Sequence, residues 1–222
     1  MTVDNVEQSK REDNQPKRLN SPDPVIRSMY LEITNISQGL NIALLVENVT
    51  DERFRSSIVE HLYSPILFAL ASLLITIIFW TRYYFDTRII NRSYRTFAAL
   101  WFFIHAVTVG INVNLVQEPS AWMLSAGVLL FFGAGFYYYN LAEIRRKQRM
   151  NVISVPEEFI EWQTRRMFEL VALSILSFIG ALLIFANSQT SFSVSVVALI
   201  AAVWQLLINR DYLRFDFIHV GE

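Results

Sequence analysis

The chain has 222 residues, of which 53% are hydrophobic and only 18% are charged. A soluble domain usually carries about a quarter charged residues, and here the apolar residues also fall in long runs, so the composition indicates an integral membrane protein. The net charge of −1 gives no reason to expect a nucleic-acid partner, and the lack of cysteine excludes disulfides, thiol catalysis and cysteine metal ligands.

The N-terminal segment 1–24 is polar, mixed in charge and almost free of large apolar side chains. Such a segment cannot bury enough surface to offset the entropy of ordering, so we expect a disordered tail on the cytoplasmic side. It lacks the basic and then apolar pattern of a cleaved signal peptide. Membrane insertion is therefore expected to depend on the hydrophobic segments that follow.

Whether residues 31–47 cross the membrane decides the predicted number of spans. Residues 31–47 read LEITNISQGLNIALLVE, and a helix over the first 16 of them covers only about 24 Å, which is short for a full crossing. If it crosses, the chain has six spans with both termini cytoplasmic. If it does not, the chain has five spans with an interfacial first helix.

The polar side chains of this segment follow helical spacing and form one stripe. The polar residues concerned are Thr34, Asn35, Ser37, Gln38 and Asn41. A helix that faces lipid would avoid such a stripe, whereas a helix inside a bundle or along a wet path needs one. Interfacial helices usually carry Lys or Arg on the polar face, but this segment has none. We also expect Gly39 to allow close approach of another helix.

Five later runs each have close to the roughly 20 apolar residues that cross a bilayer as a helix. They are 63–81, 96–115, 120–140, 167–187 and 191–208. Positively charged loops stay in the cytoplasm, and the six-span topology leaves only Arg53 and Arg55 of the 19 basic residues outside. The charge pattern therefore favours an all-α membrane domain over residues 27–215 with six spans, followed by a short cytoplasmic tail over 216–222.

Several short patterns in this domain resemble a known family. The first helix ends in the run Ala43–Val46, and the second ends in an aromatic and basic cluster, Trp80–Tyr84. Arg165 and Arg166 introduce a final helical hairpin, which turns over Asn187–Thr190. With six helices and both termini inside, the chain resembles the single-repeat bacterial relatives of the lysosomal potassium channel.

This resemblance implies a homo-oligomer, a tetramer in that family, in the bacterial inner membrane. It also implies a pore lined by the first helices, with an apolar constriction that we expect at Ile36, Leu40 and Leu44. Rings of apolar side chains can gate by dewetting. In a second register the polar stripe lines the pore, and in a third reading the stripe only packs against neighbouring helices. The family's Phe-Ser-Asp signature is absent, because Ile33-Thr34-Asn35 stands in its place.

Other candidate residues lie farther along the chain. His105 and Asn112 fall inside the third predicted span, where an ionisable side chain is a functional candidate and an amide can bridge helices. We expect a neutral His105 that bonds to a neighbouring helix. A loop is predicted over 82–95, after the second span. It holds a basic cluster that is expected to set topology, or to contact lipid head groups or a cytoplasmic protein partner. Its members are Arg82, Arg88, Arg92 and Arg95.

The sequence contains no nucleotide-binding loop, catalytic triad, intramembrane carboxylate pair or metal-ligand cluster. We therefore expect no enzyme activity, no cofactor and no metal. The expected function is that of a potassium-channel-like multi-pass membrane protein. The alternative is a non-conducting scaffold, or the partner-binding membrane component of a multi-protein system.

Overall fold

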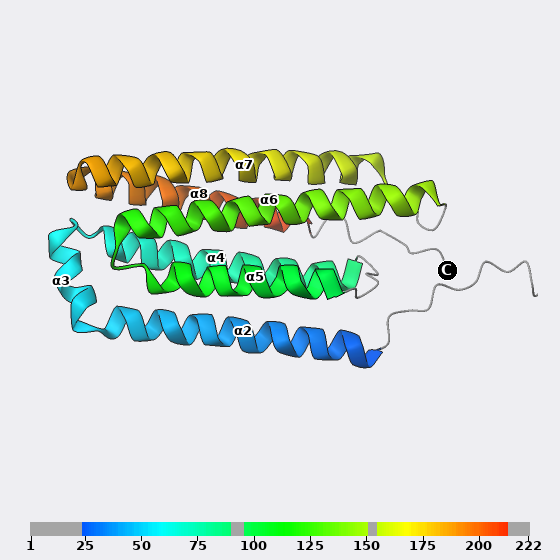
Figure 1. Ribbon diagram of the computed structural model, residues 1–222, viewed down its shortest axis with the longest axis horizontal. Coiled ribbons are helices and arrows are strands. Elements are labelled where there is room, and N and C mark those ends of the chain that lie inside the picture. Colours follow the sequence, from blue (N-terminus) through cyan, green and yellow to red (C-terminus); the bar gives the residue numbers. More distant parts are fainter. Residues whose placement is uncertain (1–23, 90–95, 151–154, 213–222) are drawn as a thin grey trace, which may run out of the picture.

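The computed structural model describes residues 24–89, 96–150 and 155–212, and within these ranges every regular element is a helix. Six long helices run side by side, and the short helix α3 lies across one end of them (Figure 1). The long helices are α2 (Pro24–Thr50), α4 (Ser64–Ile89), α5 (Thr96–Asn114), α6 (Pro119–Arg149), α7 (Glu157–Ala186) and α8 (Ser191–Tyr212), and α3 spans Glu52–Glu60. The predicted all-α class is confirmed over these ranges.

Four helical segments are long and apolar enough to cross a membrane, as in a multi-pass membrane protein. They are Ser64–Arg82, Pro119–Arg149, Glu157–Ala186 and Ser188–Asn209. In α5 the apolar part that qualifies is shorter, Phe103–Asn114. The helix α2, which carries the polar stripe, is not among the four. Its length is nevertheless sufficient, because 27 residues rise about 40 Å.

Helices α4 and α6 extend well beyond the runs that hydropathy marks. The segment 82–89, expected as a loop, continues α4, and 141–149 continues α6. The extension of α6 is stabilised by a second apolar cluster, in which Leu141 and Ile144 pack against the start of α7 at Phe159 and Ile160. Helical backbone satisfies its own hydrogen bonds, so a helix with an apolar stripe to bury does not need to end at the membrane boundary.

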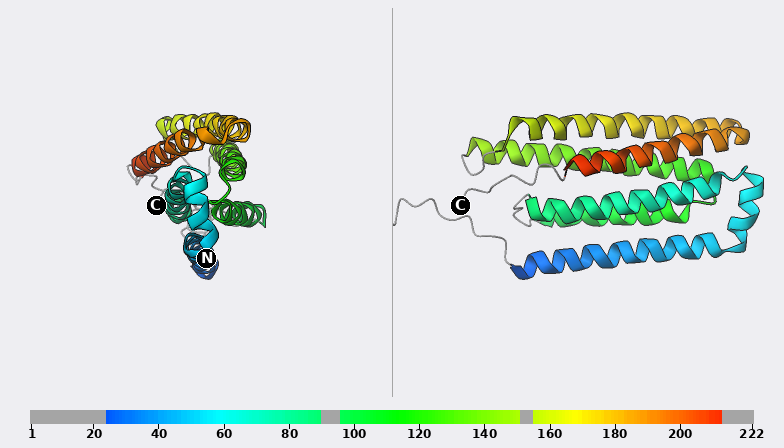
Figure 2. Two further views of the ribbon diagram at one scale, coloured as in Figure 1. Left: turned by 90° about the vertical axis from the view of Figure 1, so that its left-hand side faces the viewer. Right: turned by 180° about the vertical axis from the view of Figure 1, so that it is seen from behind.

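The helices pack in a defined order. Helix α6 lies along α7, α4 along α8, and α2 against α4 and α5. The end-on view in Figure 2 places α2 at one edge of the bundle and α7 at the opposite edge. The start of α2 and the end of α8 point to the same end of the bundle, and α3 lies at the other end (Figures 1 and 2).

Short connections at the α3 end keep neighbouring helices antiparallel. Pro119 occupies the first turn of α6, where its missing N–H removes no helical hydrogen bond. The short 3-10 helix η1 (Ser188–Thr190) joins α7 to α8, and the Asn187 side chain accepts a hydrogen bond from the Gln189 backbone N–H. The expected tails 1–24 and 216–222 lie outside the described residues, except for Pro24, which begins α2.

Candidate functional site

The polar stripe of α2 faces the inside of the bundle. Thr34, Gln38 and Asn41 are all buried, and Gln38 is only 4% exposed. Leu45 continues the same buried line toward the end of the helix. Because α2 contacts α4 and α5, the stripe lies against these two helices. Within a single chain, therefore, the stripe packs against neighbouring helices.

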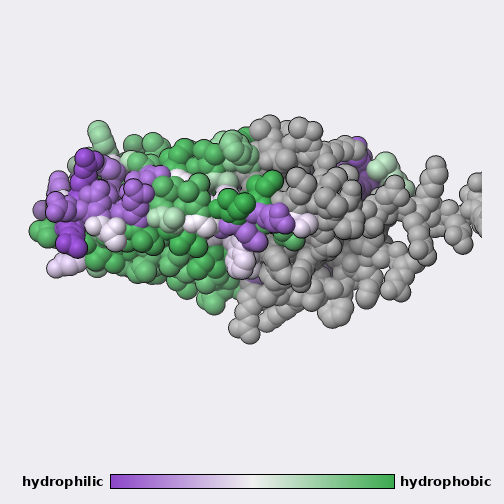
Figure 3. Space-filling model, turned by 90° about the horizontal axis from the view of Figure 1, so that it is seen from below, coloured by the Kyte–Doolittle hydropathy of each residue, from purple (hydrophilic) through white to green (hydrophobic). Residues whose placement is uncertain are grey.

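The opposite side of α2 is apolar and open. Ile36 is 72% exposed and Leu40 is 59% exposed, and their i, i+4 spacing places them on one face. Figure 3, which views the molecule from the α2 side, shows a hydrophilic end near α3, a broad apolar area next to it and a smaller hydrophilic patch beyond that area. Leu44, the third predicted constriction residue, is half-buried and packs on the core.

Asn35 and Ser37 lie outside the buried line. Asn35 is exposed and accepts a hydrogen bond from the Trp80 indole Nε1, at 2.8 Å, which ties α2 to α4. Ser37 is half-buried at the edge of the stripe. The stripe that the structure forms is thus narrower than the predicted set, because Asn35 points about a quarter turn away from Thr34 at 100° per residue.

A glycine on α5, which the sequence did not single out, sets the distance between α2 and α5. A Cβ atom added at Gly110 would lie 3.2 Å from Asn41 Oδ1, tighter than an ordinary van der Waals contact. The missing side chain therefore lets Asn41 reach the α5 backbone. Gly39 was expected to play this part, but an added Cβ there would meet no atom within 4 Å, so its face of α2 is open within the chain.

Asn112 joins three helices at a fully buried position. Its Nδ2 donates to Ser125 Oγ at 2.8 Å and to the Trp122 carbonyl at 3.3 Å. Its Oδ1 accepts from Ser72 Oγ at 3.2 Å, and Ser72 in turn accepts from Trp122 Nε1 at 2.8 Å. The amide thus connects α5 to α4 and α6, which is the bridging role that was predicted. Neither Ser72 nor Trp122 was predicted as a partner.

A second amide contact connects α2 to α5 near α3. Asn48 Nδ2 donates to Asn114 Oδ1 at 3.0 Å and also to the Leu44 carbonyl. Asn114 Nδ2 donates to the Gly110 carbonyl one turn earlier. The α2–α5 boundary is therefore polar from mid-helix to its end.

His105 lies between α4 and α6. Its ring stacks on Phe79, with the ring centroids 4.2 Å apart and an interplanar angle of 8°. The position of an added Cβ at Gly133 is 3.8 Å from His105 Cε1. The sequence predicted that His105 hydrogen-bonds to a neighbouring helix; the structure places its ring in an aromatic stack, on the wall of a cavity.

This cavity has a volume of about 420 Å³ and lies among α4, α6, α7 and α8. Its wall is built from Leu, Ile, Val, Ala and Phe side chains over most of its length. Polar side chains gather at the end away from α3, where Arg166 of α7 and Gln205 and Asn209 of α8 contribute to the wall. Nothing in the hydropathy pattern distinguishes these apolar wall residues from lipid-facing ones.

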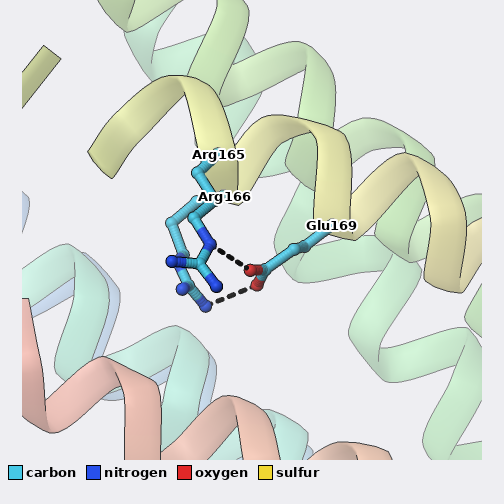
Figure 4. A network of polar contacts seen from close by, with 3 residues as sticks. All are labelled: Arg165, Arg166 and Glu169. Carbon is cyan, nitrogen blue, oxygen red and sulfur yellow. Dashed lines mark hydrogen bonds and ion pairs between the residues drawn. The ribbon is translucent and has the colours of Figure 1, made fainter. Parts of the chain in front are cut away.

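Arg166 is buried at this polar end. Its Nη1 donates to Glu169 Oε2, and the exposed Arg165 donates from Nε to Glu169 Oε1 at 3.2 Å (Figure 4). The Arg166 guanidinium also lies 5.8 Å from the centre of the Trp162 ring, within reach of a cation–π interaction. The paired arginines therefore point to different surroundings, one to the cavity and one to the surface.

Arg82 differs from its predicted place in a basic cytoplasmic loop. It lies within α4 and is buried, with its guanidinium 4.3 Å from the centre of the Tyr137 ring and 4.9 Å from that of Trp162. The helix continues through this position, so the side chain packs against α6 and α7. The side chain of Arg88, and Arg92 and Arg95 altogether, lie outside what the structure describes.

No family model, curated protein or solved structure matches the chain. Among the described residues, no group of three or more His, Asp or Glu side chains lies close enough together to hold a metal ion. The polar α2 boundary and the cavity with its basic end are thus the two features from which a function can be argued.

Proposed function

We propose that the chain is a six-span membrane protein with both termini in the cytoplasm, and that copies of it assemble around α2 into a potassium-channel-like oligomer. The side-by-side packing of six long helices supports the number of spans. The common direction of the α2 start and the α8 end supports the placement of both termini on one side. Arg53 and Arg55 belong to α3 at the opposite end. Only these two of the 19 basic residues would then lie outside, which agrees with the excess of Lys and Arg on the cytoplasmic side under the positive-inside rule.

The orientation of α2 supports a crossing helix over an interfacial one. An interfacial helix turns its polar side to water and its apolar side to lipid and protein. In α2 the polar stripe is buried against α4 and α5, and Ile36 and Leu40 are exposed. This inside-out arrangement suits a helix that is surrounded by lipid or by apolar surfaces of other copies.

The proposal of an oligomer rests on the exposed apolar face of α2. Because the polar stripe is buried within the chain, Ile36 and Leu40 are the side chains of α2 that could face a symmetry axis. Rings of such side chains would form the dewetting constriction that the resemblance implies. Potassium as the ion comes from the resemblance alone. A pore lined by the polar stripe would require α2 to rotate away from α4 and α5.

The chain contains no cysteine, so single cysteines can test the axis directly. We expect Leu40→Cys to form disulfide-linked dimers on oxidation in the membrane, because copies of residue 40 would meet there. The matched control is Leu182→Cys, on the exposed surface of α7. Equal cross-linking of the two variants, or none at residue 40 in a purified oligomer, would count against assembly around α2.

Conduction is tested separately with liposomes that contain the purified protein. We expect potassium flux that exceeds sodium flux, and a higher leak of both ions from Leu40→Ala, since truncation widens the constriction. Leu182→Ala provides the comparison of equal size on a lipid-facing helix. A well-folded oligomer without flux would leave the six-span topology standing and exclude the channel.

The number of spans is tested by the location of the N-terminus. A reporter fused before Thr2 is expected to be cytoplasmic, because six spans bring the N-terminus to the same side as the basic α6–α7 end. A periplasmic reporter would exclude six spans and restore the five-span alternative with α2 outside the membrane.

The second candidate function, a non-conducting scaffold, is favoured by the extension of α6 and α7. These helices have 31 and 30 residues, about 45 Å each, and pass the roughly 30 Å of hydrocarbon. Charged side chains cover this extension, among them Arg145 and Arg149 on α6 and Glu158 and Glu161 on α7, all exposed. A cytoplasmic protein partner would bind to these charged side chains.

A further inference from the structure

The cavity has the dimensions of a ligand site. Its volume of about 420 Å³ falls within the roughly 300–1,000 Å³ of ligand pockets. Along α7 it reaches from Arg166 to Leu183, about 25 Å at 1.5 Å per residue. That length exceeds the roughly 15 Å of one leaflet's hydrocarbon. The wall is therefore long, narrow and apolar, with one polar end.

The cavity opens to the surface of the bundle. Leu176 of α7 and Val197 of α8 both contribute to its wall, yet they are 57% and 63% exposed. A side chain in an enclosed cavity has no such exposure, so the opening lies between α7 and α8. In a membrane this opening faces the acyl chains of the lipid.

The polar end carries donors that the chain itself does not satisfy. Arg166 uses Nη1 for Glu169, but its buried Nε has no hydrogen-bond partner. The Nε2 atom of Gln205, a wall residue on α8, also lacks one. Buried donors without acceptors are costly, so this end suits a ligand that brings acceptor oxygens.

We propose that the cavity holds an acyl chain of an anionic phospholipid, whose phosphate accepts hydrogen bonds from Arg166 and Gln205. Arginine binds phosphate through charge-assisted hydrogen bonds, and no Asp or Glu is among the described residues of the cavity wall. The lipid comes from the leaflet at the basic end of the bundle. The proposal rests on the membrane orientation given above, but it does not depend on conduction or on assembly.

The first test compares lipids retained by the protein. The full chain is reconstituted in vesicles of equal parts phosphatidylcholine and phosphatidylglycerol, extracted in mild detergent, and its bound lipids are counted by native mass spectrometry. We expect phosphatidylglycerol to be enriched. Arg166→Gln should lower its retention roughly tenfold, the effect of losing a charge-assisted hydrogen bond. Equal retention of the two lipids by the unaltered chain would overturn the proposal.

The neighbouring arginine is the matched control. Arg165 carries the same charge and contacts the same Glu169, but its side chain is 74% exposed. Arg165→Gln should therefore leave phosphatidylglycerol retention within about twofold of the original. If both substitutions reduce retention equally, the lipid is bound by surface charge, and the cavity is not its site.

A second pair of variants tests the apolar part without any change of charge. Ala201 lines the cavity, so Ala201→Phe should fill it and abolish retention of phosphatidylglycerol. Ala172→Phe adds the same ring on the exposed face of α7 and should have no effect. Thermal unfolding in detergent verifies that both variants fold. Undiminished retention by a folded Ala201→Phe variant would exclude the cavity.

Discussion

The two sides of the bundle are held together by different interactions. On the α2 side, amides and hydroxyls meet: Asn48 of α2 donates to Asn114 of α5, and Ser72 of α4 donates to Asn112 of α5. On the α6–α7 side, small residues and rings do so. Gly127 lies under the Phe178 ring, Ser174 Oγ donates to the Gly127 carbonyl at 2.7 Å, and Gly180 receives Met123.

Both kinds of contact are expected of helices that lie in a lipid bilayer. Lipid tails are as apolar as leucine, so burial of apolar surface drives helices together weakly in a bilayer. Close van der Waals packing and interhelical hydrogen bonds remain as sources of specificity. Close packing joins α6 to α7, whereas hydrogen bonds join α2, α4 and α5. Substitutions should therefore destabilise the α6–α7 pair through steric overlap and the α2–α4–α5 group through lost hydrogen bonds.

The largest effect is expected at Gly127. An added Cβ would lie 2.8 Å from the Phe178 ring, and Gly127→Val would add two more carbons, so the helices must separate. We expect a loss of about 3 kcal/mol in the free energy of unfolding, measured by denaturant titration in detergent. Gly39→Val, on the open face of α2, is the control and should change it by less than about 1 kcal/mol. Similar losses at both glycines would show that the α6–α7 packing is not special.

The second largest loss in the free energy of unfolding is expected when the amide of Asn112 is removed. Asn112→Leu deprives Ser72, Ser125 and the Trp122 carbonyl of a partner, and we expect a loss of about 1–2 kcal/mol. Asn35→Leu, which removes a single exposed hydrogen bond to Trp80, should cost about 0.5 kcal/mol. If the two substitutions cost the same, the buried network adds nothing beyond one hydrogen bond.

A smaller effect is expected where α2 meets α5. Gly110→Ala pushes a methyl group to 3.2 Å from Asn41 Oδ1, and we expect a net loss of about 1 kcal/mol. In combination with Asn41→Ala the methyl group has room, so the double variant should lose less than the two single changes added together. A double-mutant cycle measures this coupling. Strict additivity would mean that the two residues do not touch.

The smallest expected change is a gain in the free energy of unfolding, on substitution of Gln38. Both amide atoms of Gln38 are buried without a hydrogen-bond partner, and replacement of an unsatisfied polar group by an apolar one of similar size is neutral or stabilising. We expect Gln38→Leu to raise the free energy of unfolding by up to about 1 kcal/mol. A marked loss would show that Gln38 has a partner such as bound water, which would strengthen the case for a wet path beside α2.

Much of the candidate site was visible in the sequence, and much was not. The spacing of Thr34, Gln38 and Asn41 predicted one polar stripe, and Asn112 was predicted to bridge helices. The partner of Asn41, Gly110, was missed because a glycine inside an apolar run carries no sign of what approaches it. Arg82 was predicted in a loop because a basic residue after an apolar run usually marks the membrane boundary, yet α4 continues and buries it.

By itself the sequence determined the helical class, the approximate places of the helices and the residues that share a face, because hydrophobic runs and the 3.6-residue period are local properties. Only the tertiary structure decided how each helix is rotated about its axis. It turned the stripe of α2 inward, separated buried Arg166 from exposed Arg165, and opened a cavity beside α8. In a membrane protein the lipid-facing and core-facing sides are both apolar, so hydropathy cannot tell them apart.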